Sequence, residues 1–111
     1  MPTVPGCDQA IVEPTKVAAY LLSGTHPIGR AKARFFKRFG FREDAPGELM
    51  QALLDHVGAY AVAHIDSFTY GIKYRVDGPL DSPDGRNPGV STVSIVRRGE
   101  TTPRFVTAFP C

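Results

Sequence analysis

The sequence predicts an α+β fold in which N-terminal helices pack on a C-terminal antiparallel β-sheet of three or four strands. Apolar residues recur at helical spacing through the first 60 residues, and beyond residue 67 they alternate with polar residues with a period of two. Segments rich in glycine and proline separate the later elements. Helices grouped before strands are typical of an α+β layer. The chain of 111 residues fits one domain, residues 1–111.

Three helices are expected in the first half of the chain. The first begins at Glu13-Pro14, where a first turn tolerates proline, and ends at Ser23-Gly24. The second follows Thr25-His26-Pro27 and stops at Gly40, because glycine readily takes the left-handed conformation of a helix C-cap. The third begins near Pro46 and ends between residues 59 and 64. Its apolar residues at helical spacing are expected in the core: Leu49, Leu53, Leu54 and Val57.

The clearest strand is predicted over residues 68–76, where aromatic and branched residues alternate with Thr69, Gly71, Lys73 and Arg75. A loop over residues 77–89 leads to a second strand over 90–97, and a turn at 98–100 leads to a third over 104–109. Strict alternation places Lys73 and Arg75 on the sheet face away from the helices. By the same rule, Phe105, Thr107 and Phe109 share one face of the last strand, and Val106 and Ala108 share the other.

Composition limits the classes of function. The net charge of +2 does not by itself indicate nucleic-acid binding, but residues 30–42 carry six basic residues and no acidic one, which indicates a local basic patch. No apolar run approaches the roughly 18 residues of a membrane span, and the N-terminus lacks the pattern of a signal peptide. We therefore expect a cytoplasmic protein without membrane contact. Cys7 and Cys111 do not form a disulfide framework and are expected to be free thiols.

Two residues near the second helix are candidates for chemistry. Lys32 falls on the apolar face of that helix, where a lysine either extends its amine past the core or holds its charge beside a pocket. His26 precedes the helix, where an exposed imidazole can act as general acid or base or can simply cap the helix. The basic residues on the opposite helix face are either solvated or bind phosphate: Arg30, Arg34, Lys37 and Arg38.

The strands add further candidates. If the face carrying Thr107 is open, a hydroxyl between aromatic rings suits single-stranded nucleic acid, with Phe109 stacking on the substrate. If that face is the core, Thr107 is a satisfied buried hydroxyl. Lys73 and Arg75 are candidates for binding an anionic substrate. His56 and His64 have no partners at metal-ligand spacing, so neither a metal site nor a cofactor is expected.

Motifs across nearly the whole chain resemble an uncharacterised bacterial family known only as a domain of unknown function. The matching segments are Tyr20-Leu21-Leu22, His26-Pro27-Ile28-Gly29, residues 32–36, Gly40-Phe41, residues 71–74, residues 77–80, residues 83–86 and residues 103–110. This resemblance implies no activity. The chain is also similar to the barnase, colicin and RelE group of ribonuclease toxins. The similarity lies in helices that precede an antiparallel sheet, in a His and a Lys early in the chain, and in a hydroxyl and aromatic residues late in the chain.

The second resemblance implies RNA cleavage by 2′-hydroxyl attack without a metal ion. It assigns His26 as acid or base, Lys32 or the pair Lys73 and Arg75 to phosphate charge, and Thr107 to substrate positioning. The hypothesis is therefore a small RNA-directed toxin-like domain, a metal-independent ribonuclease, with a neutralising protein partner. Two alternatives stand beside it: a non-catalytic protein- or nucleic-acid-binding module of a toxin–antitoxin or phage-defence pair, and a structural domain with no site. The ribonuclease hypothesis requires His26, Lys32 and Thr107 to converge on one cleft.

Overall fold

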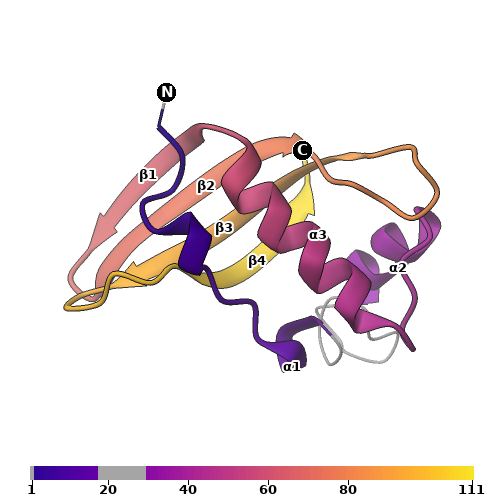
Figure 1. The fold of residues 1–111 in the computed structure, drawn as a ribbon, viewed down its shortest axis with the longest axis horizontal. Coiled ribbons are helices and arrows are strands. Elements are labelled where there is room, and N and C mark those ends of the chain that lie inside the picture. Colours follow the sequence, from indigo (N-terminus) through magenta and orange to yellow (C-terminus); the bar gives the residue numbers. More distant parts are fainter. Residues whose placement is uncertain (1, 18–29) are drawn as a thin grey trace.

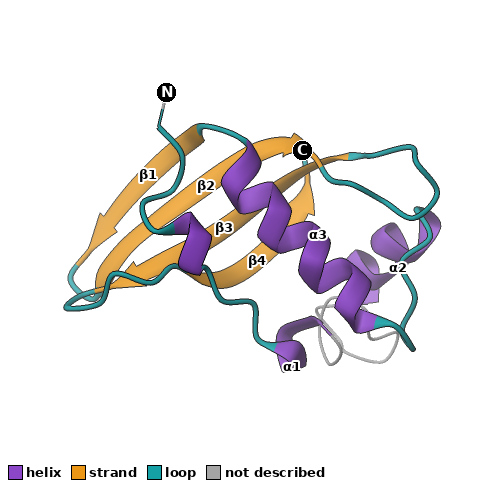
Figure 2. Cartoon of the chain, in the orientation of Figure 1, coloured by secondary structure: helices purple, strands orange, loops and turns teal. Residues whose placement is uncertain are grey.

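The computed structural model describes residues 2–17 and 30–111. Four strands form one antiparallel sheet in the order β1-β2-β3-β4. The long helix α3 lies across one face of this sheet (Figures 1 and 2). The elements are η1 (Cys7–Gln9), α1 (Pro14–Lys16), α2 (Arg30–Arg38), α3 (Pro46–Ala59), β1 (Val62–Phe68), β2 (Gly71–Pro79), β3 (Gly89–Arg97) and β4 (Arg104–Pro110). This arrangement confirms the predicted α+β class.

The two faces of the sheet differ in what covers them. Val76, Thr92 and Ala108 stand in one row across β2, β3 and β4, and each is at most 1% exposed. The His56 side chain of α3 contacts Thr92, so this row faces the helix, and we call its side the inner face. Side chains alternate along a strand, so the neighbouring row that includes Arg75 and Thr107 belongs to the opposite, outer face.

The core forms between α3 and the inner face. Leu49, Leu53 and Val57 are buried on α3, as the helical spacing predicts. Phe36 of α2 and Val90 of β3 belong to the same buried cluster as Leu53. Residues before α1 also cover the inner face, since Val4 is buried against Val57, Val62 and Val76. The segment before α1 is therefore part of the core.

The helices begin and end close to where the sequence predicts. α3 begins at Pro46, and α2 ends at Arg38, two residues before Gly40. Gly40 has a φ of +99°, and the N–H of Phe41 donates to the carbonyl oxygen of Phe36 at 3.3 Å, which closes the helix end. Of the predicted first helix, α1 is described; the remainder lies outside the described residues.

The strand predicted over residues 68–76 is wrong in one respect, because it contains a hairpin turn. β1 ends at Phe68, Thr69 and Tyr70 form the turn, and β2 begins at Gly71. Alternation of apolar and polar residues continues through the turn, so the pattern alone hides it. Gly71 carries the signal: a Cβ at this position would lie 2.5 Å from the carbonyl oxygen of Val96, so only glycine fits.

The prediction that Phe105, Thr107 and Phe109 share one face is also wrong. Thr107 pairs with Val93 and Phe105 pairs with Ser94, so Val106 is an extra residue in β4 and forms a β-bulge. One extra residue reverses the alternation on one side of the bulge. Phe105 is consequently buried in the core with Ala108. Thr107 and Phe109, which pair with Val93 and Ser91, remain on the outer face.

Some features are absent from the described part of the chain. No helix within residues 2–17 and 30–111 is long and apolar enough to cross a membrane. In the same ranges, no three side chains of His, Cys, Asp or Glu are grouped to hold a metal ion. Cys7 and Cys111 are free thiols.

Candidate functional site

Lys32 and Thr107, two of the three predicted catalytic residues, lie in direct contact. The Nζ atom of Lys32 donates a hydrogen bond to Oγ1 of Thr107 at 2.5 Å, although the residues are 75 positions apart in the sequence. Phe36 and Ala33 anchor α2 in the core, and Arg34 is exposed on the other side of the helix. Lys32 lies between these two sides, is half-buried, and reaches β4. The structure thus brings Lys32 and Thr107 together, as the predicted site requires, and their catalytic roles stay predictions.

A second lysine reaches the same part of β4. The Nζ atom of Lys16 donates to the carbonyl oxygen of Val106 at 3.1 Å. Lys16 is the last residue of α1, and the next residue, Val17, is fully buried and holds α1 against the core. Two successive residues at the β-bulge thus each contact a lysine ammonium: Val106 contacts Lys16, and Thr107 contacts Lys32. We call the group formed by Lys16, Lys32 and Thr107 the basic corner.

The basic corner has the chemistry of an anion site. Lysine ammonium groups bind phosphate as compact point charges, and a threonine hydroxyl can donate to a phosphate oxygen. β-Bulges often lie next to active sites, where they redirect a side chain. Sequence analysis missed Lys16, because the alternation of β4 does not reveal which carbonyl lies at the bulge.

His26, the third predicted catalytic residue, lies outside the described residues. Its role as general acid or base, and its position relative to the basic corner, stay predictions. The first described residue of α2 is Arg30.

The predicted substrate-binding residues lie on the outer face, apart from the basic corner. Arg75 stands in one row with Val93 and Thr107, so two strand spacings, about 10 Å, separate Arg75 from Thr107. Lys73 lies two residues further along β2 on the same face. The register therefore confirms that Lys73 and Arg75 project away from α3. Phe109 pairs with Ser91, also on this face, and is half-buried.

Arg75 is already engaged with a carboxylate. Its Nε atom lies 3.2 Å from Oδ1 of Asp77, and the hydroxyl of Ser91 donates to the same oxygen at 2.6 Å. The Nε atom is buried but forms no hydrogen bond of good geometry. The Arg75 side chain as a whole is 42% exposed, so N–H groups other than that of Nε can contact a ligand on the outer face.

Sequence analysis gave His64 no role, but the structure pairs it with a carboxylate. The Nε2 atom of His64 lies 3.0 Å from Oδ1 of Asp66, and both side chains are more than half exposed. His64 stands opposite Arg75, so it is on the outer face, three strand spacings or about 14 Å from Thr107. His64 and Asp66 are two residues apart in β1, and side chains two positions apart on a strand lie on the same face. At that distance His64 does not belong to the basic corner.

His56 is a buried structural residue. Its Nε2 atom lies 3.0 Å from the carbonyl oxygens of both Gly78 and Val90, and its Nδ1 atom lies 3.0 Å from Oγ1 of Thr92. Two carbonyl acceptors require a proton on Nε2, so the neutral ring accepts the Thr92 hydroxyl at Nδ1. Burial lowers the pKa of His56, and this effect exceeds the opposite one of the two carbonyl groups and Asp77, which raise the pKa. His56 therefore joins α3 to the sheet as a neutral side chain.

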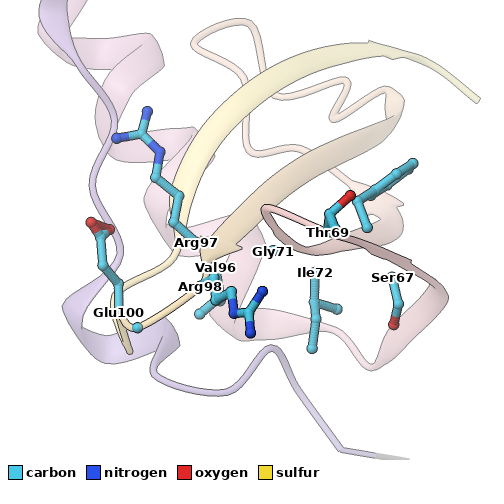
Figure 3. Close-up of a pocket in the computed structure, with 10 residues that line it drawn as sticks. Ser67, Thr69, Gly71, Ile72, Val96, Arg97, Arg98 and Glu100 are labelled. Atoms are coloured by element: carbon cyan, nitrogen blue, oxygen red, sulfur yellow. The ribbon is translucent and has the colours of Figure 1, made fainter.

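A hollow lies at the end of the sheet where the two hairpin turns meet. It has a volume of about 500 Å³ and is lined by residues of both turns, among them Phe68, Ile72, Arg97 and Arg98. Figure 3 shows Ser67 and Ile72 extending to one side of the sheet, and Thr69 and Arg97 extending to the other. Side chains on both sides of the sheet therefore line the hollow, and none of them belongs to the basic corner.

Comparisons with known proteins support the predicted resemblance. The family model described as Domain of unknown function (DUF6883) matches residues 3–111. A solved structure titled "Contact-dependent growth inhibition toxin - immunity protein complex from Klebsiella pneumoniae 342" contains a similar chain, with a TM-score of 0.72 and 16% sequence identity. The similarity covers 92% of this chain and 100% of that chain, and it shows a shared fold. None of the curated proteins matches.

Proposed function

This chain belongs to the DUF6883 family, whose function is unknown, and we propose that it is a small RNA-directed toxin domain that cleaves RNA at the basic corner. The observation that carries the proposal is the contact of Lys32 with Thr107 at the β4 bulge, beside the Lys16 ammonium. These residues come from three separate elements, α1, α2 and β4. Fold similarity to a chain from a toxin–immunity protein complex supports a place in a pair made of a toxin and a protein partner.

The proposed reaction is metal-independent transesterification. A base removes the proton of the 2′-hydroxyl, the 2′ oxygen forms a bond to phosphorus, and the bond from phosphorus to the 5′ oxygen breaks as that oxygen accepts a proton. The products are a 2′,3′-cyclic phosphate and a 5′-hydroxyl. His26 is the residue proposed for proton transfer. Lys16 and Lys32 stabilise the charge that develops on the non-bridging oxygens, and Thr107 donates a hydrogen bond to one of them.

The test is cleavage of single-stranded RNA by purified protein in EDTA, combined with growth of a bacterial host that expresses the chain. We expect the wild type to cleave RNA and arrest growth. His26→Gln and Lys32→Met are each expected to lower the cleavage rate at least tenfold, because each removes one interaction made in the transition state. His64→Gln is the matched control: it changes an exposed histidine about 14 Å from Thr107 and should leave the rate unchanged.

Equal melting temperatures of the variants are needed for this comparison. Intact RNA after incubation with folded wild type, or equal rates for His26→Gln and the wild type, contradicts the ribonuclease proposal. The second candidate then takes its place: a non-catalytic module of a toxin–antitoxin pair. The similar solved chain supports that candidate as well, because its complex contains an immunity protein beside the toxin. Growth inhibition without RNA cleavage, or protection of a host from a co-expressed toxin, would support this second candidate.

A further inference from the structure

Two exposed aromatic side chains stack on each other at the β1–β2 turn, and we call this pair the platform. Phe68 is 44% exposed and Tyr70 is 53% exposed. Their ring centroids are 5.3 Å apart and their planes differ by 13°, so the rings are stacked. The Nζ atom of Lys73 lies 5.1 Å from the Phe68 centroid and 5.9 Å from the Tyr70 centroid. The platform is therefore held in a defined geometry and carries a positive charge.

The fold places Arg97 on the same sheet face as Phe68, two strand spacings or about 10 Å away. The N–H of Arg98 donates to the carbonyl oxygen of Tyr70 at 2.8 Å, which joins the β3–β4 turn to the β1–β2 turn. The two turns lie side by side at one end of the sheet (Figure 1). Gly71 pairs with Phe68 on one side and Arg97 on the other, so no side chain separates these two residues on the outer face. We call Phe68, Tyr70, Lys73 and Arg97 the aromatic tip.

The cations of the aromatic tip are available to an anionic ligand. Within residues 2–17 and 30–111, no carboxylate forms an ion pair with Lys73 or Arg97. The carboxylates near them have other partners: Asp66 contacts His64 and Glu100 contacts Arg104. The tip therefore combines exposed aromatic side chains with two cations that no carboxylate of the described residues neutralises.

We propose that the aromatic tip binds single-stranded RNA, with one base stacked on the platform and the adjacent phosphates on Lys73 and Arg97. Stacking on aromatic rings next to cations is the usual way in which proteins bind single strands, because every base presents a π-face. Cations next to exposed aromatic side chains favour a polyanionic single strand, which supplies both phosphates and bases, over a protein partner. The inference rests on the proposed function, and it adds a binding site for the same substrate.

The tip and the basic corner bind different nucleotides. Phe68 is three strand spacings from Thr107 across the sheet and four residues away along it, which gives a separation of about 20 Å. Arg75 lies between them on the same face. An RNA strand that follows the outer face can thus contact the tip, Arg75 and the basic corner in turn. The tip increases affinity for RNA that is long enough to reach it and takes no part in the bond cleavage.

The test measures binding and cleavage separately. Binding uses a fluorescent single-stranded 12-nucleotide RNA with 2′-O-methyl groups, which cannot react, titrated with the full chain. Phe68→Ala is expected to weaken binding roughly fivefold to 100-fold, whereas Phe68→Trp retains it, because stacking is the contribution removed. Ile65→Ala is the matched control: Ile65 is 55% exposed on the same strand and pairs with Tyr74, on the inner face. A duplex of the same length should bind more weakly than the single strand.

The outcomes distinguish the two proposals. RNA binding that depends on Phe68, without any cleavage, supports the aromatic tip and removes the ribonuclease proposal. Cleavage that depends on His26, with equal RNA affinity for the wild type, Phe68→Ala and Ile65→Ala, supports the ribonuclease and overturns the aromatic tip. Affinity for a protein partner that depends on Phe68, with RNA affinity unchanged, also overturns it and assigns the tip to protein contact.

Discussion

Replacing Leu53 by alanine is expected to lower the free energy of unfolding by about 2 to 5 kcal/mol. Leu53 is fully buried between α3 and the sheet, in the cluster that also holds Phe36 and Phe105. The substitution removes apolar contacts and leaves a cavity that the close-packed surroundings fill only in part. A loss of this size is a large fraction of the stability of a domain of ordinary size.

Arg34→Ala is the control for Leu53→Ala. Arg34 lies on the exposed face of α2, so its replacement should change the free energy of unfolding by less than about 0.5 kcal/mol. Urea denaturation followed by far-ultraviolet circular dichroism gives both values. Equal midpoints for the two variants would show that α3 does not contribute Leu53 to the core.

His56→Leu is expected to lower the free energy of unfolding by about 2 to 4 kcal/mol at pH 8. Leucine has a similar volume, so packing is largely kept. The variant loses the hydrogen bonds of the imidazole to Thr92, Gly78 and Val90. A buried hydroxyl and two carbonyl groups then lose a partner, which is more unfavourable than the absence of the bonds alone.

The same residue makes stability depend on pH. The pKa of His56 is lowered from its ordinary value of 6.5 by burial, so below pH 6.5 the unfolded chain binds more protons than the folded chain. The contribution of His56 is therefore complete above about pH 6.5 and decreases as the pH falls below it. Unfolding measured from pH 8 to pH 5 should show this decrease for the wild type and for His64→Gln. A decrease of the same size in His56→Leu would assign it to other groups.

The choice of pH range separates His56 from the carboxylates. Hydrogen bonds from Arg86 and Ser82 lower the pKa of Asp84 below its ordinary value of 3.8. A carboxylate with a lowered pKa stabilises the fold above that ordinary value and loses the effect on further acidification. Asp84 thus acts below the range of the measurement, and a change between pH 8 and pH 5 reports on histidine.

Sequence predicted the helices better than the details of the sheet. Pro46 and Gly40 mark helix ends by their backbone chemistry, so α3 and the end of α2 follow from single residues. The bulge at Val106 has no such marker, and the turn at Thr69 and Tyr70 has only the glycine that follows it, because the apolar pattern passes through both without a break. These details depend on how neighbouring strands pair, which is a tertiary property.

The candidate site was predictable only in part. Lys32 is a candidate because it interrupts an apolar helix face, and Thr107 is a candidate because it lies among aromatic residues. The two side chains do contact each other. The reason given for Thr107 was partly wrong, because Phe105 lies on the opposite face in the core. The role of Lys16 could be recognised only in the folded chain, because Lys16 contacts β4 at the bulge. The pair of His64 and Asp66 could also be recognised only there, because the sequence did not predict the bounds of β1. His56 had a usable signal: its spacing from Leu49 and Leu53 places it on the buried helix face.

The extra residue at Val106 also governs how this chain should be compared with its relatives. A chain shorter by one residue at this point would pair β4 with β3 without interruption and would turn either Phe105 or Thr107 to the opposite side of the sheet. Substitutions elsewhere on the strand cannot produce that exchange. Members of the family that differ in length here will therefore differ in the composition of the outer face even where the aligned letters agree. Strand length, more than residue identity, will separate members that keep the basic corner from members that lack it.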